Sequence, residues 1–137
     1  MKEKIVFVDT GAWFALADKS DHYHNRAVQI YPELLNKYRQ LMTTNLVVAE
    51  TYLLIRRALD WRSAITFLEN VSASPRIARI YSEQSTEDSA EEILRRYQDQ
   101  DFSFTDAVSF AVMGRFHIQE AFAFDQHFAT AGFTLIQ

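Results

Sequence analysis

Short runs of mostly apolar residues alternate along the chain with longer segments of helical pattern. Five such runs predict β-strands, over residues 4–9, 41–44, 76–82, 120–125 and 133–137. The stretches 5–8 and 121–124 are each apolar throughout, as is typical of central strands covered on both faces. The alternation and the length of 137 residues predict a single α/β domain, residues 1–137, with a mostly parallel sheet.

Polar residues ahead of several helical segments predict where helices begin. Ser20 or Asp21 would cap a helix, and Pro32 would either kink that helix or start a second one. Asn45 would cap the next helix and Asp60 the one after it.

The two most apolar runs each lead into a carboxylate. Asp9 follows the run at 5–8, and Asp125 follows the run at 121–124. In open α/β sheets, ligands bind beyond the carboxyl ends of the strands, where the connections switch sides. We therefore expect both acids at a binding site, although Asp9 could instead cap the helix that opens near Gly11, and Asp125 could cap a turn.

Glu50 is the least expected acid, because it lies in a strongly apolar helical segment. Its neighbours three and four residues away are Leu46, Val47, Leu53 and Leu54. A carboxylate among aliphatic groups is costly unless a cation compensates it. Glu50 therefore either reaches water at the edge of the buried face or meets a cation supplied from elsewhere in the fold.

A fourth acid, Asp106, lies at the start of a predicted helix. Ser103 and Asp106 have capping-box spacing, in which each side chain binds the other's backbone N–H. The same position also points a carboxylate out of the first helical turn, and Thr105 beside it could hydrogen-bond a group of acids. For His127, close to Asp125, we expect a surface role rather than contact with substrate.

Composition and charge narrow the chemistry of this set of acids. If the four carboxylates converge, their mutual repulsion raises some pKa values or demands a cation. The chain has no cysteine, and hard oxygen ligands favour Mg²⁺ or Mn²⁺ over zinc. Such sites act on phosphodiesters. The net charge of −4 gives no support to nucleic-acid binding by the whole protein surface.

Four segments in order along the chain carry a resemblance to a known family. They are VDTGAW, TTNLVVAET, DFSFTDAVSFAVM and AFAFDQHF. In these segments the sequence resembles PIN-domain ribonucleases, and among them the VapC-type toxins of bacterial toxin–antitoxin pairs. The resemblance implies a three-layer fold with a five-stranded parallel sheet flanked by helices.

The resemblance also implies the roles of particular residues. Asp9, Glu50, Asp106 and Asp125 would form an acidic catalytic quartet around Mg²⁺ or Mn²⁺. We expect Asp9, Asp106 and Asp125 to hold the metal, and Glu50 to help orient or deprotonate the attacking water. Support for the acids would come from neighbouring polar side chains, those of Thr105 and Asn45. Candidate contacts to the RNA backbone are Arg56, Arg57 and Arg115.

The expected activity is metal-dependent cleavage of tRNA or rRNA, with a cognate antitoxin and a second copy of the chain as partners. One alternative is a phosphatase of the haloacid-dehalogenase type, but that class needs an acid two residues after its first aspartate, where this chain has Gly11. Another alternative is a PIN domain that binds RNA without cutting it. The apolar run near the N-terminus is broken at Asp9, which is not typical of a signal peptide, and no segment is long enough to span a bilayer. We therefore expect a cytoplasmic protein.

Overall fold

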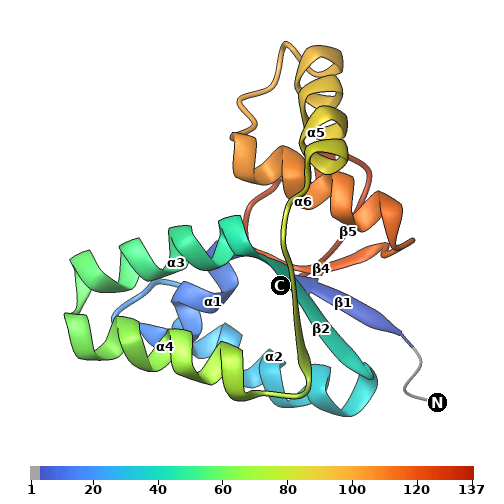
Figure 1. The fold of residues 1–137 in the computed structure, drawn as a ribbon. Coiled ribbons are helices and arrows are strands. Elements are labelled where there is room, and N and C mark those ends of the chain that lie inside the picture. Colours follow the sequence, from blue (N-terminus) through green and yellow to red (C-terminus); the bar gives the residue numbers. More distant parts are fainter. Residues whose placement is uncertain (1–3) are drawn as a thin grey trace.

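A computed structural model describes residues 4–137 (Figure 1). Residues 1–3 lie outside the described part, and with them the start of the N-terminal segment that is not typical of a signal peptide. Five strands form one sheet: β1 (Ile5–Val8), β2 (Gln40–Thr44), β3 (Ile77–Ile80), β4 (Glu120–Phe122) and β5 (Thr134–Ile136). Their order is β3-β2-β1-β4-β5, and all four neighbouring pairs are parallel. The predicted parallel sheet is confirmed.

Helices cover both faces of the sheet. They are α1 (Thr10–Ala17), α2 (His24–Lys37), α3 (Asn45–Ala58), α4 (Trp61–Ala73), α5 (Gln84–Arg96), α6 (Phe104–Arg115) and α7 (His127–Thr130). The chain passes from β1 through β2 to β3 in one direction and then returns to β4 on the other side of β1. Because such crossovers are right-handed, the reversal places α1 to α4 on one face and α5 and α6 on the other (Figure 1).

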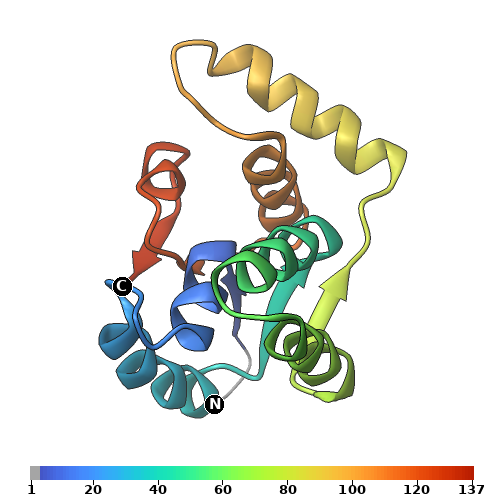
Figure 2. The ribbon, with the colours of Figure 1, turned by 90° about the vertical axis from the view of Figure 1, so that its left-hand side faces the viewer.

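The reversal makes β1 and β4 neighbours at the centre of the sheet. Val8 pairs with Phe122, and the backbone N–H of Asp9 donates to the carbonyl oxygen of Phe122 at 3.1 Å. This pairing brings the carboxyl end of β1 next to that of β4, the switch point at which α/β sheets bind ligands. Figure 2 looks toward this end of the sheet.

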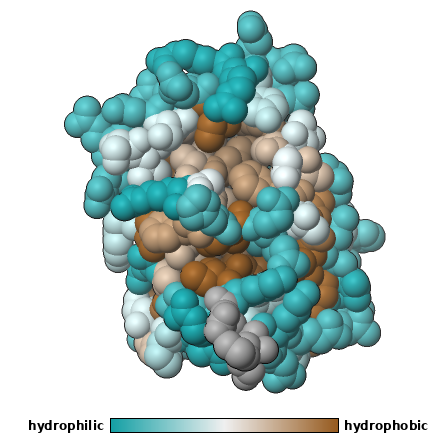
Figure 3. All heavy atoms as spheres, turned by 90° about the vertical axis from the view of Figure 1, so that its right-hand side faces the viewer, coloured by the Kyte–Doolittle hydropathy of each residue, from teal (hydrophilic) through white to brown (hydrophobic). Residues whose placement is uncertain are grey.

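The core is built from the central strands and the helices packed on them. Phe7 and Phe122 are fully buried, which confirms that these apolar runs are covered on both faces. Trp13 of α1 contacts the rings of Tyr31 and Phe67, with ring centroids 6.3 and 6.0 Å away. Figure 3 shows the opposite end of the molecule, where hydrophilic side chains surround an apolar centre.

The predicted helix starts had mixed outcomes. Asp60 caps α4 as predicted, since its side chain accepts a hydrogen bond from the Ser63 backbone N–H at 2.7 Å. Asn45 does not cap α3. Thr44 does, because its hydroxyl accepts from the Val47 N–H, and Asn45 is the first helical residue.

The start of α2 was predicted too early. The helix begins at His24, and Ser20 and Asp21 lie in the preceding turn. There the Asp21 carboxylate accepts from the backbone N–H of Tyr23 at 3.0 Å, so it closes a turn instead of capping the helix. Pro32 lies inside α2 and does not start a second helix. None of the described helices combines the length and the apolar character needed to cross a membrane.

Candidate metal centre

Asp9 occupies the N-cap position of α1, but it does not act as a cap. Its side chain makes no capping hydrogen bond, and the residue is only 5% exposed. The capping alternative for Asp9 is therefore wrong. A buried carboxylate without that role is costly unless something else compensates it.

The pKa of Asp9 shows what surrounds it. Burial is the largest cause of an increase in this pKa from 3.8 to about 7. The nearby backbone N–H of Thr10 opposes the increase, whereas the negative charges of Asp106, Asp125 and Glu50 add to it. Folding therefore gathers acids from β1, α3, α6 and the end of β4 closely enough for each to act on Asp9.

Asp106 combines a structural and an electrostatic role at the start of α6. The predicted capping box is confirmed: Asp106 Oδ2 accepts from the Ser103 N–H at 3.1 Å, and Ser103 Oγ accepts from the Asp106 N–H at 3.0 Å. Burial raises the pKa of Asp106, and the charge of Asp125 adds to that increase. The Ser103 N–H and the imidazole of His127 lower the same pKa and offset part of it.

Asp125 and His127 complete a compact group with Asp106. Asp125 Oδ1 accepts from the backbone N–H of His127 at 2.9 Å, so the predicted turn-capping role is also present. The Nδ1 atom of His127 lies 3.2 Å from Asp106 Oδ2 and 3.4 Å from Asp125 Oδ1. One potential ligand atom from each of the three residues lies within 4.8 Å of the others. The expected surface role of His127 is wrong, because its ring is half-buried between two carboxylates and Phe102.

Glu50 is exposed and reaches water at the edge of the buried face of α3, the first of the two alternatives given for it. Leu53 and Leu54 on the same helix are 44% and 42% exposed, so this part of α3 is not the buried face. The hydroxyl of Thr10 donates to Glu50 Oε1 at 2.8 Å. That bond ties the carboxylate of α3 to the residue directly after Asp9.

Comparison with known proteins identifies the family. The PIN domain family matches residues 6–134. The chain belongs to the PIN domain family. It is 35% identical over 134 residues to the 23S rRNA-specific endonuclease VapC20 of Mycobacterium tuberculosis, covering 97% of this chain and 98% of that protein. This PIN domain is therefore a homologue of a VapC toxin.

Solved structures agree with the family. The crystal structure of M. tuberculosis VapC20, a sarcin–ricin loop cleaving toxin, matches with a TM-score of 0.87 and covers 94% of this chain and 96% of that one. VapBC2 from Rickettsia felis, bound to a DNA fragment from its promoter, matches with a TM-score of 0.72 at 11% identity, covering 96% and 97%. FitAcB from Neisseria gonorrhoeae gives a TM-score of 0.67 at 13% identity, with 96% of each chain covered. The last two similarities concern the fold alone.

Two residues of this PIN domain site were missed by sequence reasoning. Thr10 lies in the segment VDTGAW but was given no role, and His127 was assigned to the surface. Their positions next to Asp9 and two residues after Asp125 were the available signals. Neither signal identifies the partner, because Glu50 is 40 positions from Thr10 and Asp106 is 21 positions from His127.

The predicted supporting residues, Thr105 and Asn45, make hydrogen bonds to groups other than the acids. Thr105 directly precedes Asp106 in α6, and its carbonyl oxygen accepts from the Ser109 hydroxyl at 3.0 Å. Asn45 opens α3, and its side chain accepts from the Ser82 backbone N–H at 2.9 Å, which ties α3 to the segment after β3. Support of the acids by Thr105 and Asn45 remains a prediction.

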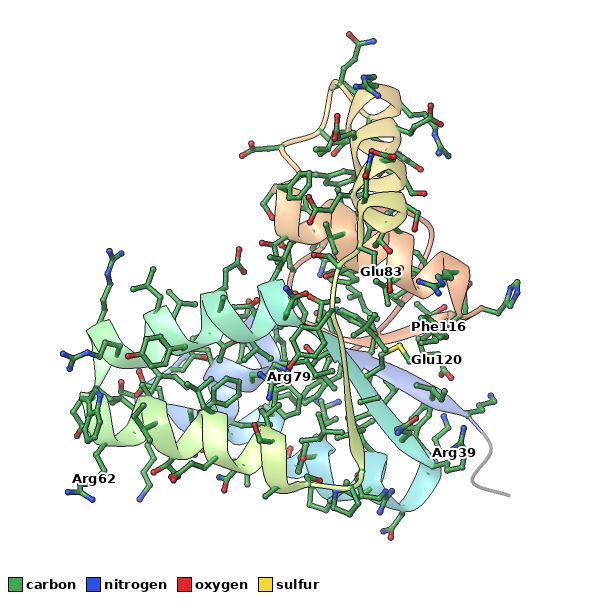
Figure 4. All side chains as sticks on the ribbon, viewed as in Figure 1. Arg39, Arg62, Arg79, Glu83, Phe116 and Glu120 are labelled. Atoms are coloured by element: carbon green, nitrogen blue, oxygen red, sulfur yellow. The ribbon has the colours of Figure 1, made fainter. Side chains whose placement is uncertain are left out.

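The candidate RNA-binding arginines lie far along their helices from the acids. Arg56 and Arg57 are exposed in the last turn of α3, about 9 Å or more along the axis from Glu50 at 1.5 Å per residue. Arg115 ends α6, and the next residue, Phe116, lies near Glu120 at the amino end of β4 (Figure 4). That end of the sheet is opposite the acids, so Arg115 of the same protomer lies away from the site.

The residues of this PIN domain fit a divalent cation. Asp106, Asp125 and His127 each place a ligand atom within 4.8 Å of the others, and the buried carboxylate of Asp9 lacks a capping bond that would compensate its charge. A cation beside these groups would offset the burial of the Asp9 carboxylate, the main cause of its raised pKa, and the smaller repulsion from the neighbouring acids. Since His127 adds an imidazole nitrogen near two of these carboxylates, the donor set suits Mn²⁺ as well as Mg²⁺.

Proposed function

We propose that this PIN domain is a metal-dependent endoribonuclease, the toxin of a toxin–antitoxin pair, and that it cuts 23S rRNA. The observation that carries the proposal is the gathering of four acids at the carboxyl ends of β1 and β4. The similarity over nearly the full length to a 23S rRNA-specific endonuclease favours rRNA over tRNA as the substrate. The activity would take place in the cytoplasm, where ribosomes are found.

Membership of the PIN domain family disfavours the phosphatase alternative. The chain matches that family over residues 6–134 and lacks the acid that a haloacid-dehalogenase phosphatase needs at the position of Gly11. A PIN domain that binds RNA without cutting it remains the alternative that a cleavage assay decides.

In the proposed mechanism, each acid has a distinct task. Asp9, Asp106 and Asp125 would hold Mg²⁺ or Mn²⁺ through carboxylate oxygens. When bound, such an ion offsets the charge of the phosphate and lowers the pKa of bound water. Glu50, held by the Thr10 hydroxyl, orients the attacking water or accepts its proton. His127 contacts Asp106 and Asp125 and so orients both carboxylates.

Bound cations also explain how an acidic protein could approach RNA. The formal charge of the chain is −4, and two divalent cations would bring it to 0. The site itself would then be locally positive toward a phosphate group. Arg56 and Arg57 remain candidate contacts to the RNA backbone farther from the scissile bond.

The direct test is cleavage of rRNA under controlled metal supply. We expect protein stripped with EDTA to leave 23S rRNA intact, and added Mg²⁺ or Mn²⁺ to restore cutting at a defined position, mapped by sequencing of RNA ends. The metal dependence follows because a buried carboxylate with other acids beside it needs a cation to compensate its charge. A folded, metal-supplied protein that binds rRNA but never cuts it would instead support the non-cleaving alternative.

We further propose two protein partners, a second copy of the chain and a cognate antitoxin. Exposed apolar side chains at the outer ends of α3 and α4 offer a surface for self-association: Leu53, Leu54, Leu59 and Trp61. Light scattering is expected to give twice the chain mass of 15.9 kDa, and a monomer at all concentrations would remove the dimer proposal.

The antitoxin is expected to be the product of an adjacent small gene, which, purified and added in excess, is expected to stop cleavage.

A further inference from the structure

A stack of two aromatic rings lies beside the acids and has no part in the mechanism above. The rings of Tyr23 and Phe124 are parallel, with centroids 4.3 Å apart and an interplanar angle of 8°. They come from residues 101 positions apart, so only the tertiary fold brings them together. We call this pair the aromatic platform.

The platform is anchored in the core on one side. Phe124 packs edge-on against the fully buried ring of Phe122 in β4, with centroids 5.8 Å apart. Tyr23 is held by its backbone N–H, which donates to Asp21 Oδ2, and by His22, whose ring meets its own at 4.8 Å. These contacts fix the ring orientation before any ligand arrives, which reduces the entropy lost on binding.

The outer ring of the platform remains open to solvent. Tyr23 is 43% exposed, whereas Phe122 on the inner side of Phe124 is fully buried. Single exposed aromatic residues are common on protein surfaces and do not by themselves indicate a binding site. A preordered parallel pair is different, because it offers a flat surface of the kind on which nucleic-acid bases stack.

The platform lies at the same end of the sheet as the acids. Phe124 directly precedes Asp125, so their Cα atoms are about 3.8 Å apart. On the other side, the segment before α2 lies next to the chain end of β5, as Figure 2 shows, and Arg26 Nη2 donates to the carbonyl oxygen of Gln137 at 2.8 Å. Tyr23 therefore stacks on the residue that directly precedes Asp125.

The charges around the platform are compatible with a nucleic-acid strand. Lys19 and Arg26 are exposed on either side of Tyr23 in the chain. Asp18 accepts from Ser20, and Asp21 accepts from the Tyr23 N–H, but both carboxylates keep their negative charge. The segment is therefore balanced in charge, and what it offers a strand is an aromatic face for stacking.

We propose that Tyr23 and Phe124 bind an unpaired base of the substrate RNA by stacking and thereby position the phosphate next to it at the acids. This inference rests on the proposed nuclease function and names the part of the substrate that the platform recognises. Sequence-tolerant stacking suits loops, whose bases are unstacked and accessible. Tyr23 would act as a positioning residue, since it touches the substrate away from the reacting atoms.

The test compares substitutions at Tyr23 with a matched control. The probe is a short synthetic RNA spanning the mapped cleavage site, with Mg²⁺ or Mn²⁺ present. Tyr23→Leu is expected to raise KM about tenfold with kcat little changed, because one base loses its stacking partner. Tyr23→Phe keeps the ring and is expected to match the unaltered protein. Phe116→Leu removes an exposed aromatic ring from the opposite end of the sheet and is expected to change neither parameter.

A second measurement requires no altered protein. Abasic nucleotides are placed one at a time along the RNA, and KM is expected to rise at one position close to the cleaved bond. If no abasic position raises KM, or if Tyr23→Leu behaves like Phe116→Leu, the platform proposal is wrong while the nuclease function stands. If the unaltered protein cuts no RNA with metal supplied, the nuclease function itself fails.

Discussion

Replacing Asp9 with asparagine is expected to lower the rate of RNA cleavage by about 10³-fold, a loss typical of removing a positioned catalytic group. Asparagine has the same shape as aspartate but no negative charge to hold a cation. The Asp9 side chain makes no capping hydrogen bond, so removing its charge takes no cap from the start of α1. The measurement is the single-turnover cleavage rate of 23S rRNA with saturating Mg²⁺ or Mn²⁺, together with circular dichroism of the variant.

A matched control separates this effect from a general loss of charge. Asp99 is exposed in the turn after α5, and Asp99→Asn removes one negative charge there without touching the group of acids. Its cleavage rate is expected to equal that of the unaltered protein. A folded Asp9→Asn variant that cuts within tenfold of the unaltered rate would defeat the assignment of Asp9 to the metal.

The stability of the metal-free protein is expected to fall as pH rises from about 4 to about 7. The cause is Asp9, whose pKa rises from 3.8 in the unfolded chain to about 7 in the fold, chiefly because of burial. The folded state therefore holds this proton more tightly, so the extra stability is fully present below pH 3.8 and is lost as pH passes 7. The shift corresponds to about 4 kcal/mol of unfolding free energy at most. The raised pKa of Asp106 acts in the same direction.

Thermal unfolding in EDTA across this pH range provides the measurement. Asp9→Asn is expected to flatten the pH dependence and to be the more stable protein above pH 7, because it carries no buried charge at that position. Added Mg²⁺ or Mn²⁺ is expected to restore stability to the unaltered protein above pH 7, since a ligand that binds only the folded state stabilises it. If the melting temperatures of the two proteins change in parallel from acid to neutral pH, the pKa of Asp9 is not raised by folding.

The strand-end acids were within reach of sequence reasoning. Uninterrupted apolar runs before Asp9 and Asp125 indicate central parallel strands, and the ends of such strands lie at one edge of a sheet. The capping roles of Asp60 and Asp106 were also predictable, because a cap acts over three residues of the same chain segment.

Glu50 shows where local pattern is insufficient. Its aliphatic neighbours left open whether it reaches water or meets a cation, and the exposure of Leu53 and Leu54 shows that this side of α3 faces water. Which face of α3 packs inward depends on the positions of α1, α4 and the sheet, and the helix sequence does not contain those positions. The same reason explains why Asn45 was assigned as the cap, since its side chain instead binds Ser82 from a distant segment.

By itself, the amino-acid sequence determined the parallel α/β architecture, the positions of the acids at strand and helix ends, and the absence of thiolate ligands. Tertiary structure alone decided that Thr10 holds Glu50, that His127 lies between two carboxylates, and that Tyr23 stacks on Phe124. The physical reason is the sequence separation between the residues that interact. Strand, helix and cap preferences act among residues a few positions apart, whereas each of these contacts requires folding to bring a side chain into a position that its own segment does not specify.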